Sequence, residues 1–324
     1  MAESAGSAGS AGSVGSAGVA EAAGYRPLLF SIAYGMTGSV GDAEDLVQDT
    51  FLGLTRADRA GTAVADPKAY LATTVTRLGI NHLKSARVRR ETYVGEWLPE
   101  PVVAFAERPG GPAEHAELAD TLSMAFLLML EALSPVERAV FLLREAFGYG
   151  YPEVAEMTGK SEANCRQIFA RARRHLAPGA DTRPAPVPAP ERRAEGDELA
   201  RRFFQVAEGG DLEALLDLLA PDVVFHGDGG GKARAVGKSV SGLERVARLL
   251  MFGFDRNRQR GVSVRPAWVN GRPGAVMFDA EERITSVIEL DIADGAIRAL
   301  HSVSNPDKLV HLGPVSDLGL LSKQ

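Results

Sequence analysis

A proline-rich stretch divides this chain into two parts with different hydrophobic patterns. The stretch PGADTRPAPVPAPERRAEG, residues 178–196, carries alternating prolines at Pro184, Pro186 and Pro188. Proline lacks an amide hydrogen and fixes its own φ, so such a run disfavours both helix interiors and central strands. It favours an extended, semi-rigid connection. The chain is therefore expected to fold as separate units on either side of this segment.

Composition sets limits on the class of protein. With 324 residues and 45% hydrophobic content, the chain has room for two or three domains. A net charge of −6 argues against general nucleic-acid binding, although an average over the chain does not exclude local basic patches. Cys165 is the single cysteine, so no intramolecular disulfide can form. No apolar run has the length of a membrane span, and the Ala/Gly/Ser-rich residues 1–24 lack the features of a signal peptide and are expected to be disordered. A cytoplasmic protein is expected.

Helical signals dominate residues 25–176. The segment VGDAEDLVQDTFLGL, residues 40–54, has helical spacing of its apolar residues, and Asp42 is expected as its N-cap. A second helix is expected to open with Asp66 and Pro67, a capping residue followed by proline at the first helical position. Ser134 and Glu137 form a capping-box pattern at the start of a third.

The pattern changes after residue 196. Two helical stretches at about residues 197–219 precede strand-like runs, and Asp294-Gly295 separates the last two apolar runs as in a hairpin. Helices followed by an antiparallel meander favour an α+β domain, with a curved sheet wrapped on helices.

The most informative local motif is YGYPEVAEMTGKSEANCRQIFARARRHL, residues 149–176. A short helix over residues 152–158, a turn at Gly159 and a longer helix capped by Ser161 make a helix-turn-helix pattern. The longer helix has one apolar face, on which Cys165 is expected as a small core residue, and an opposite polar face. The polar face carries Asn164, Gln167, Arg171 and Arg174. This suits base edges and phosphates, although a solvated helical hairpin would show the same pattern.

Two further charged helices accompany this motif. Residues 77–90 contain basic residues and no acid, which makes them either a second DNA contact or a solvated face. The helix around Asp42, Glu44, Asp45 and Asp49 is acidic, so it should repel DNA and suit a basic protein partner. Two DNA-facing elements and one protein-facing element fit transcription better than simple repression.

These segments resemble the extracytoplasmic-function sigma factors. GDAEDLVQDTFL and PKAYLATTVTRLGINHLKSARVRR resemble sigma region 2, and LSPVERAVFLLREAFGYGYPEVAEMTGKSEANCRQIFARARRHL resembles sigma region 4. The resemblance implies contacts with core RNA polymerase by Asp42, Glu44, Asp45, Gln48 and Asp49. It implies contacts with the −10 promoter element by Arg77, Asn81, Lys84, Arg87, Arg89 and Arg90. It implies contacts with the −35 element by Ser161, Asn164, Arg166, Gln167, Arg171, Arg173 and Arg174.

Three further motifs resemble those of the sigma-J-like group, which carries a C-terminal SnoaL-like (NTF2-like) cone of sheet and helices. They are YVGEWLPEP at residues 93–101, DGGGK at 228–232 and NPDKL at 305–309; many members have proline where this chain has Glu96. The resemblance implies regulatory contacts by Tyr93, Trp97, Pro99, Asp228, Gly229, Gly230, Gly231, Lys232, Asn305, Pro306, Asp307 and Lys308. Aromatic anchors on a proline-stiffened segment would dock with little entropy loss; the alternative is that Trp97 packs only against region 2.

The expected fold is therefore multidomain, with two all-α sigma regions followed by an α+β SnoaL-like domain. The expected division is a tail at 1–24, region 2 at 25–92, a linker at 93–115, region 4 at 116–177, the proline-rich linker at 178–196 and the SnoaL-like domain at 197–324.

The expected function is a sigma factor that directs bacterial RNA polymerase to promoter DNA and is regulated in cis by its C-terminal domain. Neither a metal, a cofactor nor enzyme activity is expected. One alternative is a bifunctional DNA-binding protein whose SnoaL-like domain binds or turns over an unidentified small ligand. Its acid-base candidates would be His226, Asp228, Asp279 and His301. Another alternative is a stand-alone repressor.

Overall fold

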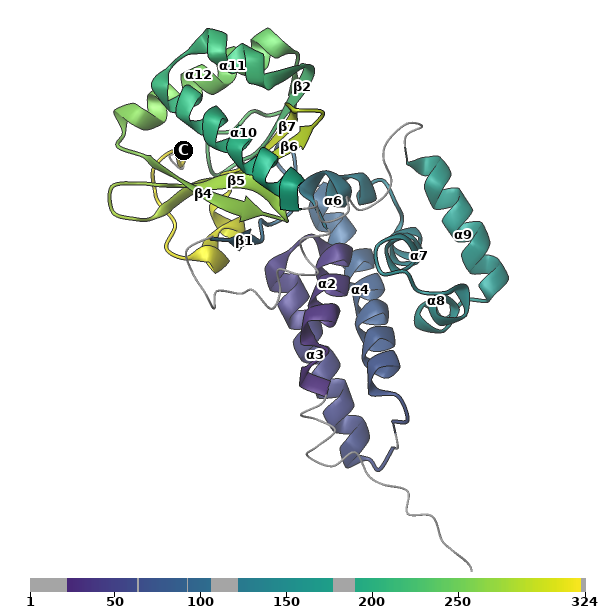
Figure 1. Ribbon diagram of the computed structural model, residues 1–324. Coiled ribbons are helices and arrows are strands. Elements are labelled where there is room, and N and C mark those ends of the chain that lie inside the picture. The colour runs from purple at the N-terminus through teal and green to yellow at the C-terminus, as the bar shows by residue number, and fades with distance from the viewer. Residues whose placement is uncertain (1–21, 63, 92, 106–121, 177–189, 322–324) are drawn as a thin grey trace, which may run out of the picture.

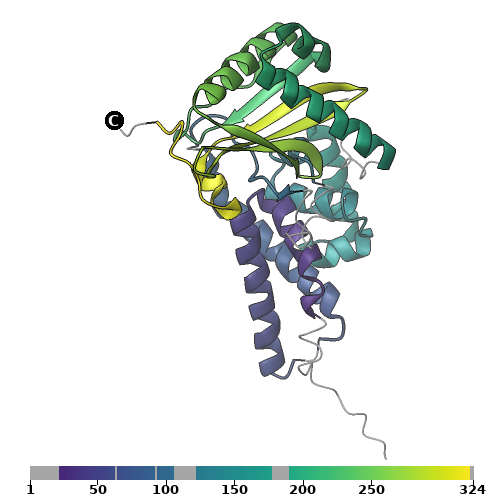
Figure 2. The same ribbon diagram turned by 60° about the vertical axis from the view of Figure 1, so that its left-hand side comes forward.

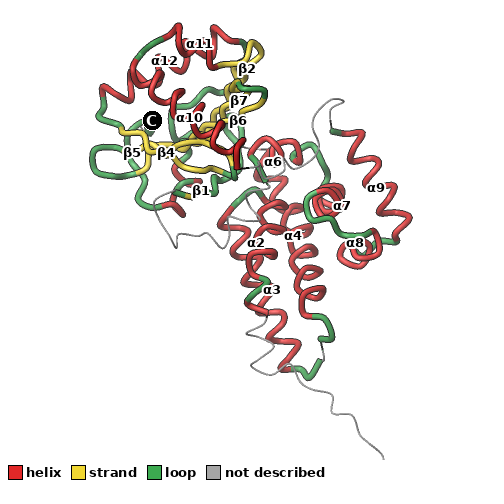
Figure 3. The backbone as a smooth tube through the Cα atoms, viewed as in Figure 1, coloured by secondary structure: helices red, strands yellow, loops and turns green. Residues whose placement is uncertain are grey.

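The computed structural model describes residues 22–62, 64–91, 93–105, 122–176 and 190–321 (Figure 1). Parts of the expected segments lie outside the described residues: 1–21 of the tail, 63 and 92 of region 2, 106–115 of the first linker, 116–121 and 177 of region 4, 178–189 of the proline-rich stretch and 322–324 of the C-terminal domain. Two bodies are visible, one built from helices and one from a sheet with helices (Figure 3).

The helical body contains two groups of helices that share one core. The first group, residues 22–91, has α2 (Arg26–Thr37), α3 (Val40–Arg59) and α4 (Pro67–Glu91). The second group, residues 122–176, has α6 (Met124–Leu130), α7 (Pro135–Glu145), α8 (Tyr151–Thr158) and α9 (Glu162–His175). A single cluster of buried apolar side chains runs through both groups. The two groups therefore pack as one body.

Two of the expected helix starts are confirmed. Asp66 accepts a hydrogen bond from the amide of Ala69 at 3.0 Å, so it caps α4. The backbone amide of Ser134 donates to Glu137 Oε2 at 3.1 Å, which is one half of the capping box at the start of α7. Both caps satisfy amides that a helix leaves unpaired at its first turn.

The expected cap of α3 is wrong. Ser39 is the N-cap, and its side chain accepts from the amide of Asp42 at 3.1 Å, which places Asp42 inside the first turn. The reason is the tight connection before it. Gly38 ends α2 in the left-handed region at φ 66°, so the chain re-enters a helix almost at once.

The C-terminal domain is a seven-stranded sheet covered by helices on one face. The strand order is β1-β4-β5-β6-β7-β2-β3. The strands are β1 (Val103–Ala104), β2 (Leu219–Asp228), β3 (Val240–Ser241), β4 (Ser263–Val269), β5 (Arg272–Phe278), β6 (Ile284–Ala293) and β7 (Ala296–Val303). The helices are α10 (Pro190–Gly209), α11 (Leu212–Leu218) and α12 (Leu243–Gln259), followed by two short 3-10 turns, η1 (Pro306–Lys308) and η2 (Val310–Leu312).

The sheet departs from the expected meander in two ways. Strands β4 to β7 are antiparallel as expected, and the Asp294-Gly295 hairpin is confirmed, with φ values of 51° and 75°. Strand β2, however, pairs with β7 in parallel, because β3 and α12 separate it from the meander in sequence. Strand β1 comes from the linker region and joins the sheet edge beside β4.

One helix and one helix boundary also differ from expectation. Helix α12 was not expected, although Val246, Ala247, Leu250 and Phe254 have helical spacing and are buried. Helix α10 begins at Pro190, so the last part of the expected linker at 178–196 is helical. Proline is tolerated at the first position of a helix, where its missing amide costs nothing.

The sheet has two apolar faces with different partners. One face packs on α10, α11 and α12 around Phe203, Leu250 and Leu300. The other face packs on the linker and the start of α6, through Leu98 and Met124. Figure 2 shows the helices of the C-terminal domain on one side of the sheet and the helical body on the other. The sheet is thus the layer on which the linker is held.

Candidate functional site

The inter-region segment, defined here as residues 93–104, is bound at one end by a buried carboxylate. Asp228 accepts from the Tyr93 hydroxyl at 2.5 Å, from the Leu98 amide at 2.9 Å and from the Lys308 amine at 2.7 Å. Asp228 is 0% exposed and Lys308 is 6% exposed. A buried charge is tolerated when it is paired and hydrogen-bonded, and this one is both. Burial, and then the hydrogen bond to Asp228, raise the pKa of the Tyr93 hydroxyl.

Lys308 links the two aromatic residues of the segment to the C-terminal domain. Its amine lies 4.2 Å from the ring centre of Trp97 and 4.9 Å from that of Tyr93, and it also donates to the carbonyl of Leu98. Trp97 also lies against α2, since a Cβ placed on Gly38 would be 2.6 Å from its ring. Trp97 therefore contacts both the helical body and the C-terminal domain.

The glycines of the DGGGK loop allow the segment to approach closely. A Cβ on Gly230, which has φ 58°, would lie 2.2 Å from the side-chain amide of Asn305. A Cβ on Gly231, with φ 68°, would lie 2.9 Å from the Cβ of Val94. Asn305 in turn donates to the Tyr93 hydroxyl at 2.8 Å. Any side chain larger than hydrogen would displace these contacts.

The remaining residues of the two motifs have other positions. Lys232 was expected to contact another domain. It instead pairs with Asp307 at 2.6 Å, in an exposed ion pair inside the C-terminal domain. Pro306 starts the η1 turn. Gly229 packs on the backbone of the same loop, and Pro99 is buried within the segment.

The far end of the segment is bound to the helical body. The Glu100 carboxylate accepts from the Val40 amide at 2.6 Å, at the N-terminus of α3, where an anion is favoured. The Tyr34 hydroxyl of α2 donates to the Glu100 carbonyl at 2.7 Å. Neither contact was expected from the sequence.

Asn270 joins the C-terminal domain to both helical groups. Its side-chain amide donates to the Tyr34 hydroxyl at 2.7 Å and to the Leu122 carbonyl at 3.0 Å. Its side-chain oxygen accepts from the Val102 amide at 3.1 Å. Asn270 is 1% exposed and has φ 49° in the turn between β4 and β5. The Asn270-Gly271 pair between two apolar runs was the signal that would have found this turn.

Two histidines face the segment from the sheet. His226 Nδ1 lies 2.7 Å from Glu96 Oε1, and His301 Nδ1 lies 2.6 Å from Glu289 Oε2, with the two rings stacked at 5.0 Å. Burial lowers the pKa of His301, but the charge and the hydrogen bond of Glu289 outweigh it, so the net direction is upward. These groups bind one another and the segment.

Asp279, the fourth acid-base candidate, lies apart from the histidines. It accepts from the Arg283 side chain at 2.9 Å and from the Ser316 hydroxyl at 2.5 Å. Burial raises its pKa, but these hydrogen bonds outweigh burial and lower it overall. Asp279 therefore anchors the C-terminal tail to the β5–β6 turn.

The acidic face of α3 is partly used within the helical body. Glu44 is bonded to Arg26, and Asp42 pairs with His82 at 3.2 Å. The other three candidates for polymerase contact are exposed: Asp45, Gln48 and Asp49.

The basic face of α4 touches the second helical group. Arg77 donates to the carbonyls of Glu156 at 2.8 Å and Met157 at 3.3 Å, at the end of α8. Asn81 and Lys84 are exposed, whereas the side chains of Arg87, Arg89 and Arg90 lie outside the described part of α4.

Helix α9 presents its polar face to solvent at the edge of the molecule (Figure 1). Ser161 caps it by accepting from the Asn164 amide at 3.3 Å. Arg171 is used internally, because it pairs with Glu137 of α7 at 2.6 Å. Burial raises the pKa of Glu137, but bonds from Ser134 and Arg171 outweigh burial and lower it to about 2. Arg171 is nevertheless exposed, and so are the other candidates for DNA contact: Ser161, Asn164, Arg166, Gln167, Arg173 and Arg174.

Two further features concern the described ranges of the chain. None of the helices there is both long and apolar enough to span a bilayer. Within the same ranges, no three His, Cys, Asp or Glu side chains are grouped so that they would hold a metal ion.

Comparisons with known proteins match all three parts of the chain. Residues 22–89 match the model of Sigma-70 region 2, residues 123–176 that of Sigma-70 region 4, and residues 200–300 that of the SnoaL-like domain. The chain is 38% identical over 305 residues to the ECF RNA polymerase sigma factor SigJ of Mycobacterium tuberculosis, covering 90% of this chain and 92% of the relative.

Two more similarities agree with this match. "Probable ECF RNA polymerase sigma factor SigI" of Mycobacterium tuberculosis is 32% identical over 291 residues, covering 88% of this chain and 92% of the relative. The crystal structure of Mycobacterium tuberculosis SigJ superposes with a TM-score of 0.72 at 34% identity, covering 92% of this chain and all of that one. The chain belongs to the extracytoplasmic-function (ECF) RNA polymerase sigma factors, and within them to the type that carries a SnoaL-like C-terminal domain.

Proposed function

We propose that this sigma factor is regulated in cis by its C-terminal domain, which holds the two promoter-reading regions together through the inter-region segment. In this proposal the chain directs core RNA polymerase to promoter DNA in the cytoplasm, where the polymerase works. The C-terminal domain sets how readily the promoter-reading form is reached.

The observation that carries the proposal is the direct packing of the two helical groups. The −10 and −35 elements are separated by about 25 base pairs, or about 85 Å of B-DNA at 3.4 Å per base pair. In the structure, Arg77 of α4 is bonded to the end of α8, and Arg138 of α7 donates to the Gly35 carbonyl of α2 at 3.1 Å. Helices that share a core cannot reach two sites so far apart. Promoter engagement therefore requires the helical body to open.

The C-terminal domain is placed to resist this opening. Asn270 is bonded to Tyr34 of the first helical group and to Leu122 at the start of the second. Asp228 and Lys308 hold the segment that connects the two groups. Opening the helical body would strain or break these contacts, so their strength sets the free energy of opening.

A graded truncation series tests this proposal. Ending the chain after Val310 removes the His311 contact to the Pro101 carbonyl, at 2.9 Å, and the Ser316 contact to Asp279, but keeps Asp228 and Lys308. Promoter-specific transcription with purified core polymerase should rise. Ending the chain after Leu176 exposes Leu98, which is 0% exposed in the intact chain, and leaves the segment without support, so transcription should be lost. Equal transcription by both truncations and the full chain would refute cis regulation.

The contacts of Asp228 and Lys308 with the inter-region segment are called the clamp. A pair of point variants separates the effect of the clamp from general effects of truncation. Asp228→Asn removes the negative charge beside Lys308 and should raise transcription in the same assay. Lys232→Gln breaks the nearby exposed pair with Asp307 and is the matched control, which should leave transcription unchanged.

The exposed polar face of α3 is the proposed contact with core polymerase. Asp45, Gln48 and Asp49 form an exposed patch that no partner in the described structure occupies. Reversing the charge with Asp45→Lys and Asp49→Lys should abolish core binding in a pull-down. Retained core binding would remove this patch from the interface and would reopen the question of a stand-alone repressor.

We infer that the C-terminal domain acts by binding and not by turnover. His226 and His301 each lie beside a carboxylate, as acid-base catalysis would need, but the partner of His226 is Glu96 of the segment and that of His301 is Glu289 of β6. A cavity lies on the opposite face of the sheet, beside α12, and neither histidine lines it. This position supports a structural role for the pair.

A further inference from the structure

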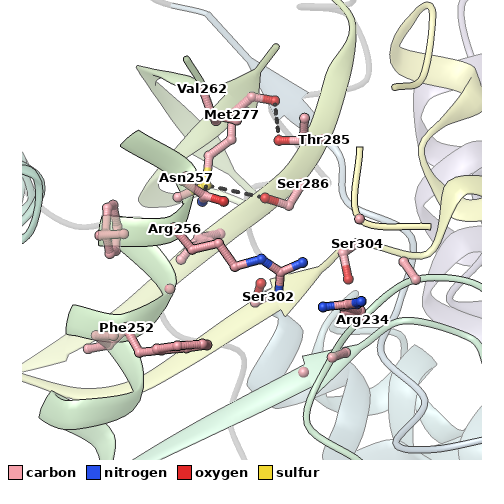
Figure 4. Close-up of a pocket in the computed structure, with 18 of the residues that line it drawn as sticks. Arg234, Phe252, Arg256, Asn257, Val262, Met277, Thr285, Ser286, Ser302 and Ser304 are labelled. Atoms are coloured by element: carbon pink, nitrogen blue, oxygen red, sulfur yellow. Dashed lines mark hydrogen bonds between the residues drawn. The ribbon is translucent and has the colours of Figure 1, made fainter. Parts of the chain in front are cut away.

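A cavity of about 330 Å³ lies between α12 and the sheet face that the C-terminal helices cover. Its inner wall is apolar and is formed by Phe225, Leu250, Phe254, Met277 and Ile288. Its other end is polar. There Arg234 and Arg256 gather with the hydroxyls of Ser302 and Ser304 (Figure 4).

The arginines at this cavity lack the acidic partners that neighbouring arginines have. On α12, the helix that carries Arg256, Arg248 pairs with Glu244 at 2.7 Å and Arg258 pairs with Asp255 at 2.5 Å. No ion pair to a carboxylate is formed by Arg234, Arg256 or Arg260 within the described ranges, and all three line the cavity. Burial, then the like charges of Arg260 and Arg234, lower the pKa of Arg256. The site therefore has a local excess of positive charge.

We propose that this cavity binds a small amphipathic organic anion. Its acidic group would lie against Arg234 and Arg256, whose guanidinium groups offer paired donors to a carboxylate, sulfonate or phosphate. Its apolar body would lie against Phe254 and Ile288. Such a ligand would supply a negative charge to the arginines and cover the apolar wall of the cavity at the same time.

The cavity lies next to the clamp on the inter-region segment. Ser304 lines the cavity and donates from its amide to the Asp228 carbonyl at 2.8 Å, while the Asp228 carboxylate binds the segment. Arg234 belongs to the loop that follows Asp228, and its amide donates to the Gly319 carbonyl of the C-terminal tail at 3.0 Å. A ligand on Arg234 and Ser304 would thus contact the loop that follows Asp228 and the strand end that precedes Lys308 in the chain. This coupling rests on the proposed cis regulation, whereas the binding itself does not.

A pair of fluorescent probes tests the binding. The probes are 8-anilinonaphthalene-1-sulfonate and N-phenyl-1-naphthylamine, which share an aromatic frame and differ in the sulfonate. The full chain should bind the sulfonate probe, and Arg256→Gln should weaken this binding by about tenfold or more, since a charged hydrogen bond is lost. Binding of the uncharged probe should be the same in both proteins.

Two further variants keep the outcome clear. Arg234→Gln should weaken binding of the sulfonate probe in the same way. Arg248→Gln should have no effect on this binding, because Arg248 is on the same helix as Arg256 but is paired with Glu244. If the full chain does not bind the sulfonate probe, or if Arg256→Gln and Arg234→Gln bind it as the full chain does, the proposed site is wrong.

Hydrogen exchange tests the coupling separately. At a saturating concentration of the sulfonate probe, exchange in a peptide covering residues 93–101 should change in the full chain and stay unchanged in Arg256→Gln. If the probe binds but exchange of the segment is unaltered, the site stands and the coupling is refuted. If the truncations of the chain transcribe equally while the probe binds, cis regulation fails and the site again stands.

Discussion

Asn270 joins four segments of the chain through one amide side chain, and its removal should be costly. Asn270→Ala would leave the Val102 amide and the Leu122 carbonyl without their buried partner. Each buried group left unpaired costs about 1–3 kcal/mol. The free energy of unfolding should fall by about 2–4 kcal/mol, measured by urea denaturation.

Part of that cost would come from the backbone, because Asn270 has a positive φ. Asp294 is the control, since it has φ 51° in an exposed hairpin turn and its ion pair with Arg298 is exposed and contributes little. Asp294→Ala should cost about 1 kcal/mol. If Asn270→Ala costs no more than Asp294→Ala, the three side-chain hydrogen bonds contribute nothing to stability.

The stacked pair of histidines predicts a dependence of stability on pH. The folded pKa of His301 is raised above its ordinary value of 6.5, because Glu289 favours the charged ring more than burial opposes it. Protonation therefore stabilises the folded state. This contribution is fully present below pH 6.5 and is lost as pH rises through the folded pKa. The charged and titratable groups around the ring are Glu289, Asp291, Glu96 and His226.

Glu289→Gln should remove this dependence. The difference in free energy of unfolding between the full chain and Glu289→Gln should be largest at pH 6 and smaller at pH 9. A titration of His301 followed by NMR should place its pKa above 6.5 in the full chain and lower in the variant. An unchanged His301 pKa in the variant would contradict the assigned cause.

Some of the residues that hold the inter-region segment were predicted from the sequence, and others were not. Tyr93, Trp97, Asp228 and Lys308 were expected as contacts, because they belong to motifs that resemble a known group. Tyr34 and Asn270 were not expected as contacts, although a hydrogen bond joins them across 236 positions of the chain. A hydrogen bond at such a separation leaves no local pattern, since neither residue's neighbours reveal its partner.

At the scale of single elements, α9 gives the clearest prediction about DNA. Gln167 is exposed near its start, and Arg174 is exposed near its end. Gln167→Ala should cost about 1–3 kcal/mol in binding and relax specificity at one base pair of the −35 element. Arg174→Gln should weaken binding to all DNA sequences alike. It should also reduce the slope of log K against log salt concentration by about one, since one phosphate contact is lost.

The measurement is fluorescence anisotropy of labelled promoter DNA with the complex of core polymerase and each variant, at several salt concentrations. Arg171 is the internal contrast, because it is tied to Glu137 of α7. If Gln167→Ala and Arg174→Gln affect cognate and scrambled DNA in the same way, α9 does not read the −35 element as proposed.

Periodicity and capping predicted most elements, and the failures have physical causes. The helix-turn-helix was found because Gly159, at φ 65°, and the cap Ser161 leave local signals. Strand β1 was missed because its two residues become a strand only by pairing with β4. The parallel pairing of β2 with β7 was missed for a similar reason, since register and direction depend on distant partners.

At the scale of the whole molecule, the sequence predicted which domains are present but not how they pack. The order of two helical groups and an α+β domain follows from periodicity, turn signals and motif resemblance. The shared core of the helical groups, and the use of one sheet face to hold the linker, do not. Such packing depends on the sum of many weak contacts between segments far apart in the chain.

In the proposed function, this packed arrangement is a closed form which the C-terminal domain maintains and which promoter engagement must open. Energy transfer between dyes on α4 and α9 measures it directly. Exposed Ser85 and Ala170 are suitable positions, as Ser85→Cys and Ala170→Cys in a chain that also carries Cys165→Ser.

Transfer should be high in the free chain and should fall when the chain binds core polymerase and promoter DNA. The free Asp228→Asn chain should contain more low-transfer molecules than the free parent, and Tyr93→Phe, a milder change to the same clamp, should shift in the same direction. Lys232→Gln should match the parent. Equal transfer in the free chain and in the promoter complex would contradict the account, because the closed form would then read both promoter elements without opening.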